Sequence, residues 1–217
     1  MIATGESLNG QSSNRGILKK FDEQIKRIRG KHPVLLGGMK RKEFDCQANR
    51  LRQKLEVITE TPNGNILIVT CLPFGSLAMR MRRISCDRHA GVCDCNLATL
   101  ETKYPPKTLY ALVGVNDGRE RRLQSNGNAE IDWRIINDQV KPHHPLTAWA
   151  GIDLALLYPN VLRQHGLIFG HTAIRNAATA LWIYRGQPTF GSTGGKRFKR
   201  CSGFRFGIPS YQTLVTP

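Results

Sequence analysis

The chain has 217 residues, 40% of them hydrophobic, and its 32 Lys and Arg against 16 Asp and Glu give a formal net charge of +16. This length predicts one domain, and the apolar content is high enough for a buried core, which excludes a disordered tail. A cationic excess of this size favours a phosphate backbone as partner over a membrane or an acidic protein, because each neutralised phosphate releases a condensed counterion.

Residues 1–15 are polar and rich in Gly, Ser and Asn, which predicts a flexible lead followed by a single basic nucleic-acid-binding domain over 16–217. The lead is not a secretory signal, and no apolar run approaches the roughly 20 residues that span a bilayer. The six cysteines are irregularly spaced, so we expect reduced thiols and a cytoplasmic or nuclear protein.

The first predicted helix has one apolar face and ends near Gly30; its apolar residues are Ile17, Leu18, Phe21, Ile25 and Ile28. Residues 34–52 predict a second, more broken helix. Residues 55–60 and 66–72 have strand composition, and residues 61–65 between them are typical of a hairpin turn. A short apolar segment follows at 108–115, and residues 116–130 predict a surface loop.

The C-terminal half predicts a helix over 145–158, closed by Pro159, and a more regular one over 171–184. In the latter, Ile174, Ala177, Ala178 and Leu181 form one apolar stripe, and Gly186 follows as a stop signal. The predicted fold is therefore α+β, a helix-dominated single domain with a small antiparallel β-sheet.

Two basic runs predict contacts to a nucleic-acid backbone: Arg80, Arg82, Arg83 and Arg88, then Lys196, Arg197, Lys199, Arg200 and Arg205. The Gly-rich stretch 191–196 before the second run is not a phosphate-binding loop of the nucleotide-hydrolase type. Phe190 stands where that motif needs its first Gly, and Arg197 stands where it needs Ser or Thr.

Two further clusters have the composition of metal sites. Zinc could be held by Cys86, His89, Cys93 and Cys95, although Cys93 and Cys95 are spaced more closely than in zinc knuckles. A loop of reduced cysteines is the alternative, and no other cofactor is expected. Glu101 and Lys103, with Asp94 upstream, have the outline of a metal-dependent nuclease site, in which the carboxylates hold magnesium and the lysine orients water; a solvated charge pair is the simpler interpretation.

His171 and Arg175 would lie one turn apart on the same face of the predicted helix over 171–184. The guanidinium can hold a phosphate oxygen, and the imidazole beside it can move a proton. The phenol of Tyr211 can attack a phosphodiester. Each residue also has a structural interpretation: a histidine bonded to a backbone carbonyl, an arginine paired with a carboxylate, and a packed tyrosine.

The stretch 170–181, with His171 and Arg175, resembles the second conserved box of the tyrosine recombinases, the phage-integrase-like enzymes. Tyr211 lies 36 residues after Arg175, close to where that family has its nucleophile, and residues 38–44 are similar to the first box, with Lys40 at the position of the arginine and Arg41 beside it. The separation of His171 and Arg175 is one residue wider than in the family.

The resemblance implies a diverged enzyme that cuts and rejoins DNA through a phosphotyrosine, without a metal. Arg175, with Arg41 or Lys40, would hold the scissile phosphate, His171 would assist proton transfer, and Tyr211 would attack. The alternative is a non-enzymatic RNA- or DNA-binding subunit of a larger nucleoprotein assembly. DNA is favoured over RNA as the partner, and an oligomer fits either interpretation.

Overall fold

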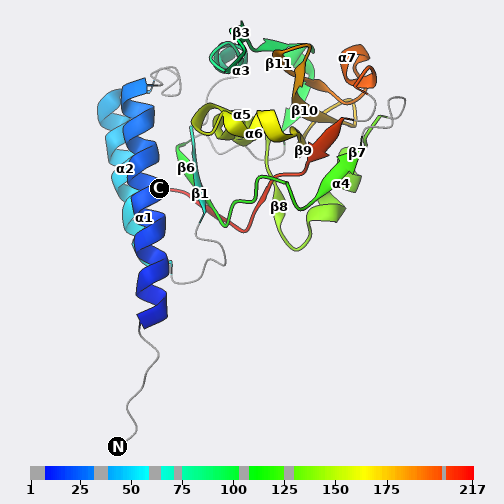
Figure 1. Ribbon diagram of the computed structural model, residues 1–217. Helices are drawn as coiled ribbons and strands as arrows, with labels where there is room; N and C mark the ends of the chain where they lie inside the picture. Colours follow the sequence, from blue (N-terminus) through cyan, green and yellow to red (C-terminus); the bar gives the residue numbers. More distant parts are fainter. Residues whose placement is uncertain are drawn as a thin grey trace, which may run out of the picture.

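The computed structural model (Figure 1) describes residues 8–31, 39–58, 65–70, 75–102, 108–124, 130–201 and 204–217. The helices are α1 (Leu8–Lys31), α2 (Arg41–Glu56), α3 (Gly75–Met81), α4 (Trp133–Val140), α5 (Ala148–Leu157), α6 (Asn160–Gln164) and α7 (Lys196–Lys199), with a 3₁₀ turn over Leu97–Thr99. The strands are β1 (Ile66–Val69), β2 (Ser85–Cys86), β3 (His89–Ala90), β4 (Val92–Cys93), β5 (Leu100–Thr102), β6 (Tyr110–Val113), β7 (Arg122–Gln124), β8 (His144–Pro145), β9 (Gly166–Ile174), β10 (Ala177–Tyr184), β11 (Gln187–Ser192), β12 (Arg205–Gly207), β13 (Ser210–Tyr211) and β14 (Thr213–Val215).

The largest sheet has seven strands in the order β4-β11-β10-β9-β12-β7, with β5 paired to β9. It is mixed, because β4 pairs with β11 and β12 pairs with β9 in parallel, while the remaining pairs are antiparallel. The fold is α+β, but the prediction of a helix-dominated domain with a small antiparallel sheet is wrong. Helices and strands contribute comparably, and the central layer is the mixed sheet.

The segment predicted as the most regular helix, 171–184, is instead most of the β9–β10 hairpin. Both faces of these strands are covered, so nearly every position is apolar and the period of two is hidden. Along β9, Leu167 and Phe169 belong to one core cluster, and Ile168 between them belongs to the other. The apolar residues Ile174, Ala177, Ala178 and Leu181 therefore have helical spacing only by chance, within two strands that are buried on both faces.

Helices cover both faces of the large sheet. On one face, α5 and α6 pack against β9 and β10, and on the other face, α4 packs against the same two strands (Figure 1). The predicted helix over 145–158 is confirmed as α5, which begins after Thr147, whose hydroxyl accepts a hydrogen bond from the backbone of Ala150. No helix in the described part of the chain is both long and apolar enough to cross a membrane.

Helices α1 and α2 form an antiparallel pair at one side of the molecule (Figure 1), joined by ion pairs from Arg29 to Asp45 and from Arg52 to Asp22. The helix predicted from Ile17 to Ile28 is confirmed. It begins earlier, at Leu8, so part of the segment expected to be a flexible lead is helical. Residues 1–7 lie outside the described part.

The predicted hairpin over 55–72 is wrong, because residues 55 and 56 end α2 and β1 pairs instead with β6. Its proposed turn, at residues 61–64, lies outside the described residues. Residues 116–130, predicted as a surface loop, contain β7.

The free edge of β1 is satisfied by a buried side chain of α1. Strand β1 lies at the edge of the sheet β1-β6-β14. The Gln24 amide donates to the carbonyl of Ile66 at 2.7 Å and accepts from the backbone N–H of Ile68 at 2.8 Å, as a neighbouring strand would. Because Gln24 is 1% exposed, these hydrogen bonds fix α1 on the sheet.

Candidate nucleic-acid interface

The two basic runs of the sequence meet on either side of β11. Arg82 and Arg83 follow α3, and both α3 and the β2–β3 hairpin contact β11. After β11 the chain forms α7, whose Arg197 pairs with Asp94, next to β4, at 3.4 Å. Figure 1 shows α3, β3, β11 and α7 along the upper edge of the molecule. The fold thus brings together cations that are more than 100 residues apart in sequence.

We call this region the basic end. Arg185, in the β10–β11 turn, belongs to it, and so does Arg163 of α6, which lies 3.9 Å from Asp87 in the β2–β3 turn. Arg205 extends the basic end, because its neighbour Phe206 in β12 pairs with Gly166, which lies at the same end of the sheet. Its exposed or partly exposed cations are Arg82, Arg83, Arg88, Arg163, Arg185, Lys196, Arg197, Lys199, Arg200 and Arg205.

Three hairpins end in two-residue turns with positive φ at both central positions, the type I′ geometry that Asn-Gly and Asp-Gly prefer. Each turn contains an arginine with left-handed backbone: Arg88 at 70°, Arg175 at 49° and Arg185 at 51°. This conformation costs a side-chain-bearing residue on the order of 1 kcal/mol. All three arginines are exposed, so core packing does not compensate for the cost.

Arg88 and Arg185 are the two strained arginines within the basic end. Their hairpins are neighbours, since Gln187 donates to the carbonyl of Ala90 at 3.0 Å. Arg185 was not among the predicted contacts because Arg185-Gly186 was assigned to a helix terminus. The Gly after an Arg, between two apolar runs, was the available signal for a turn.

Tyr184 orders two guanidinium groups of the basic end. The Arg185 guanidinium carbon lies 5.4 Å from the centroid of its ring, and that of Arg197 lies 5.9 Å away. Both distances are within the range of cation–π attraction, which restricts long arginine side chains without neutralising their charge. The two charges are thereby held close together over one half-buried ring.

Arg80 is the one residue of the predicted basic runs that does not reach the surface. It is 0% exposed, and its guanidinium pairs with Asp153 of α5 and donates to the carbonyl and hydroxyl oxygens of Thr70. A phosphate backbone cannot reach it there. Its assignment to the nucleic-acid contacts is therefore wrong, because Arg80 lies on the face of α3 that packs against α5.

The four candidate zinc ligands do not converge. Cys86 is buried opposite the exposed His89 in the β2–β3 pair, while Cys93 and Cys95 pack against the core. Burial raises the pKa of Cys93 to about 11 and that of Cys95 to about 12, so both are protonated thiols. Nowhere among the described residues do three His, Cys, Asp or Glu side chains form a group that could hold a metal ion.

Two of the residues implied by the recombinase resemblance lie near one another. Tyr211 in β13 pairs with His144 in β8, with ring centroids 5.3 Å apart, and the ring of His171 lies 6.5 Å from that of His144. Burial raises the pKa of Tyr211, which keeps its phenol protonated. A nucleophilic tyrosine needs the opposite shift, produced by adjacent cations.

The cationic residues of that set lie elsewhere. Arg175 is in the turn at the tip of the β9–β10 hairpin, whereas His171 lies four residues earlier in the chain, within β9. Lys40 and Arg41 are at the start of α2. This helix contacts the beginning of β6, because the Gln47 side chain accepts a hydrogen bond from the backbone of Leu109. Tyr211 lies near the other end of β6, just before β14 pairs with it. The five residues do not form one site.

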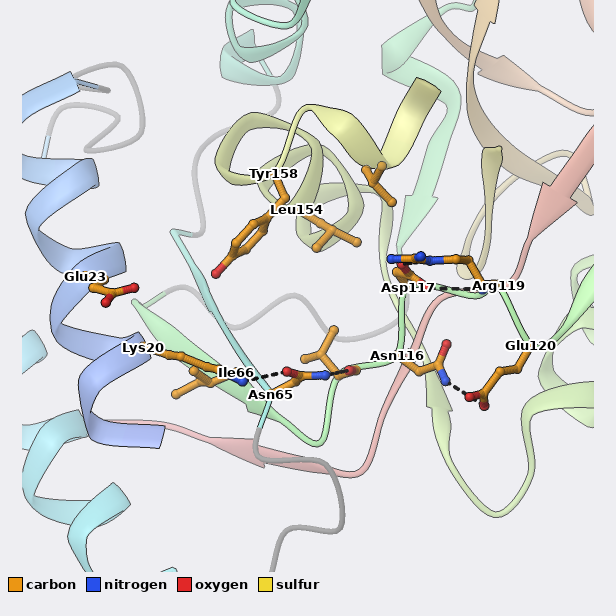
Figure 2. Close-up of a pocket in the computed structure, with 12 residues that line it drawn as sticks. Lys20, Glu23, Asn65, Ile66, Asn116, Asp117, Arg119, Glu120, Leu154 and Tyr158 are labelled. Carbon is orange, nitrogen blue, oxygen red and sulfur yellow. Dashed lines mark hydrogen bonds and ion pairs between the residues drawn. The ribbon is translucent and has the colours of Figure 1, made fainter. Parts of the chain in front are cut away.

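A pocket of about 670 Å³ lies between α1, α5 and the loop at 116–120 (Figure 2). Its cations are engaged: Lys20 donates to Asn65 at 2.8 Å, and Arg119 pairs with Asp117 at 2.6 Å. Three carboxylates face these two cations, those of Glu23, Asp117 and Glu120. This charge balance makes the pocket unsuitable for a phosphate group.

Comparisons with protein-family models, with curated proteins and with solved structures give no match for this chain.

Proposed function

We propose that this protein binds nucleic acid through the basic end, as a binding module and not as a strand-cutting enzyme. The observation that supports this most is the convergence of the two basic runs around β11. Within the basic end, Asp87 and Asp94 are the carboxylates paired with its ten cations. Such an excess of cations attracts a polyphosphate strand and releases its counterions on binding.

The helical pair α1–α2 is also rich in Lys and Arg, but its charges are interleaved with carboxylates. Arg29 and Arg52 are held in ion pairs with acidic residues of the pair itself. Cations already paired with carboxylates gain less from a phosphate, since the carboxylate competes for them. This difference favours the basic end over α1–α2 as the contact surface.

The strained arginines add a second, independent argument. Arg88 and Arg185 occupy positions where Gly or Asn would be more stable, and their side chains project from adjacent hairpin tips. Strain at an exposed position, without compensating packing, supports a role for the side chain in an interaction outside the protein. A phosphate is the partner that a guanidinium fork binds best.

Fluorescence anisotropy with labelled duplex DNA, single-stranded DNA and RNA, measured over a series of salt concentrations, tests the proposal. The variant for the basic end replaces four exposed cations by Gln: Arg82, Arg185, Lys199 and Arg200. The matched control removes the same number of charges from α1–α2: Lys19, Lys26, Arg50 and Lys54.

We expect the first variant to bind more weakly at every salt concentration. On duplex DNA, the negative slope of log K against log salt concentration should become less steep by up to about 3 to 4, because four cations are removed. The control should keep a slope close to that of the parent protein. An equal loss in both variants would place the contact surface elsewhere, and binding that is independent of salt would refute the proposal.

A further inference from the structure

Strand β9 contains a large bulge beside a second pocket. Between the adjacent pairs Ala178–Ala173 and Thr179–Phe169, β9 has three extra residues, 170–172. Thr172 fixes the bulge, because its hydroxyl accepts from the backbone of Ala148 at 2.9 Å and its carbonyl accepts from the Thr179 hydroxyl at 3.1 Å. Bulges of this kind redirect side chains next to binding sites.

The pocket at this bulge measures about 300 Å³, at the small end of the range for ligand sites. Its walls come from β5, the start of α4, the bulge and the tip of the β9–β10 hairpin. They are formed by Glu101, Trp133, Gly170, His171, Thr172, Ala173 and Asn176. Two aromatic rings, a carboxylate and an amide therefore border one small hollow.

Two polar side chains of the pocket, those of Glu101 and Asn176, are available to a ligand. Neither the Glu101 carboxylate nor the Asn176 amide forms a side-chain hydrogen bond or ion pair in the described part of the chain, and both residues are exposed. Asn176 has φ 69°, and its carbonyl accepts from the backbone of Trp133. The hairpin turn thus fixes the backbone of Asn176 next to the backbone of Trp133, at the start of α4.

Behind the pocket wall, Asn137 Oδ1 is a buried acceptor with no partner among the described residues. It lies against Gly170, where a Cβ atom would come within 2.6 Å of it. A glycine at this point of the bulge therefore keeps the approach between β9 and α4 close. It also leaves the floor of the pocket without a side chain.

The surroundings of the pocket match a nucleotide better than an isolated anion. Arg134 and Arg175 are exposed and adjacent in sequence to Trp133 and Asn176. They can contact phosphates outside the pocket, whereas the Glu101 carboxylate repels phosphate from its interior. A carboxylate instead accepts hydrogen bonds from the exocyclic amino group of a base, an amide can bond a base edge, and an aromatic ring stacks on it.

We propose that this pocket receives one unpaired nucleobase that has an exocyclic amino group. The base stacks on Trp133, its amino group donates to the Glu101 carboxylate, and the Asn176 amide forms a hydrogen bond with the edge of the base. This inference rests on the proposed function, because the strand that delivers the base is bound elsewhere through its phosphates. It predicts a preference for single-stranded segments that contain adenine, cytosine or guanine over those that contain only thymine or uracil.

Tryptophan fluorescence tests the pocket separately from the basic end. The chain has three tryptophans, and Trp149 and Trp182 are 2% and 0% exposed, so quenching by a stacked base reports on Trp133. The probes are labelled homopolymers of dA, dC and dT, about ten nucleotides long, which is within the usual site size of single-strand binders. Anisotropy of the label reports binding anywhere on the protein.

We expect dA and dC to quench Trp133 and to bind at least about fivefold more tightly than dT, which is the lower limit for a well-placed polar contact to a base. Glu101→Gln should reduce this preference, and Trp133→Leu should abolish the quenching. Asn176→Gly keeps the left-handed backbone while it removes the amide, so it separates base contact from folding. Arg185→Gln should weaken all three probes equally and leave the preference unchanged.

The outcomes are distinct. Binding by anisotropy with unchanged Trp133 fluorescence, or with equal affinity for the three probes, overturns the base pocket and leaves the nucleic-acid interface standing. No binding of any of these single-stranded probes overturns the base pocket, whereas the proposed function is overturned only if duplex DNA and RNA also fail to bind.

Discussion

Arg80 and Asp153 form an ion pair that is closed to solvent, with side-chain exposures of 0% and 1% and a distance of 2.5 Å. The pair connects α3 to α5, and both side chains also bond the backbone of Thr70 just after β1. The ring of Trp149 lies 5.4 Å from the guanidinium carbon. One arginine of a basic run thus anchors the core beneath the surface that its neighbours form.

Replacing Arg80 by Met should destabilise the protein by about 3–5 kcal/mol, because it leaves the Asp153 carboxylate buried without its partner. Urea unfolding measures the change. The double variant Arg80→Met/Asp153→Leu should recover much of the loss, since it removes both buried charges. Full stability of the single variant would show that the pair is not closed to solvent.

The same pair predicts a pH dependence of stability. Burial is the largest influence on Asp153 and raises its pKa from 3.8 to about 6, against the opposing effect of Arg80. Between these values the folded protein binds more protons than the unfolded chain, so the contribution of Asp153 to stability falls as pH rises from about 4 to 6. The free energy of unfolding, measured relative to Asp153→Asn, should show this fall; a rise over that interval would contradict the shift.

The strained turns predict opposite effects on stability and binding. Arg88→Gly creates Asp-Gly and Arg185→Asn creates Asn-Gly, the preferred type I′ sequences, so each should stabilise the protein by on the order of 0.5–1 kcal/mol. Each should also weaken nucleic-acid binding, because a guanidinium is lost. Thermal unfolding and anisotropy on the same samples separate the two effects. Unchanged affinity would remove these tips from the interface.

Tyr184→Leu keeps an apolar side chain but removes the aromatic face beneath Arg185 and Arg197. We expect a several-fold loss of affinity for nucleic acid with the same slope against salt, because the charges remain and only their ordering is lost. Tyr184→Phe should bind like the parent protein. A reduced salt slope for Tyr184→Leu would mean that a phosphate contact itself had been lost.

Tyr211 is expected to be inert toward DNA. A nicked suicide substrate, which traps phosphotyrosine intermediates, should give no covalent adduct with the parent protein, since burial keeps the phenol protonated and Arg175 is distant. Tyr211→Phe should bind nucleic acid with unchanged affinity. An adduct that disappears in this variant would restore the recombinase interpretation.

The sequence predicted the elements whose pattern shows directly in the chain. Helix α1 has one apolar face from Ile17 to Ile28, and that amphipathic period specifies a helix lying on a core. The hairpin β9–β10 was misassigned because both of its faces are buried, which hides the period of two. Its turn, Arg175-Asn176, has no Gly or Pro to mark it.

Site prediction failed for a different reason. The composition of the basic runs identified cations that do gather on one surface, yet it could not tell which helix position turns inward, and Arg80 does. Trp133 and Asn176 had no motif around them, because their neighbourhood is created by the bulge in β9 and by the pairing of β5 with that strand. Such juxtapositions depend on register, which local sequence does not specify.

The amide of Gln24 occupies the carbonyl of Ile66 and the N–H of Ile68, the groups through which β1 would otherwise accept a further strand. Helix α1 therefore covers the edge of β1 at which a second copy could otherwise pair. If α1 separates from the sheet, the unpaired N–H and C=O groups of the apolar strand β1 become a template for strand pairing between copies, so we expect the docking of the first helix to limit aggregation.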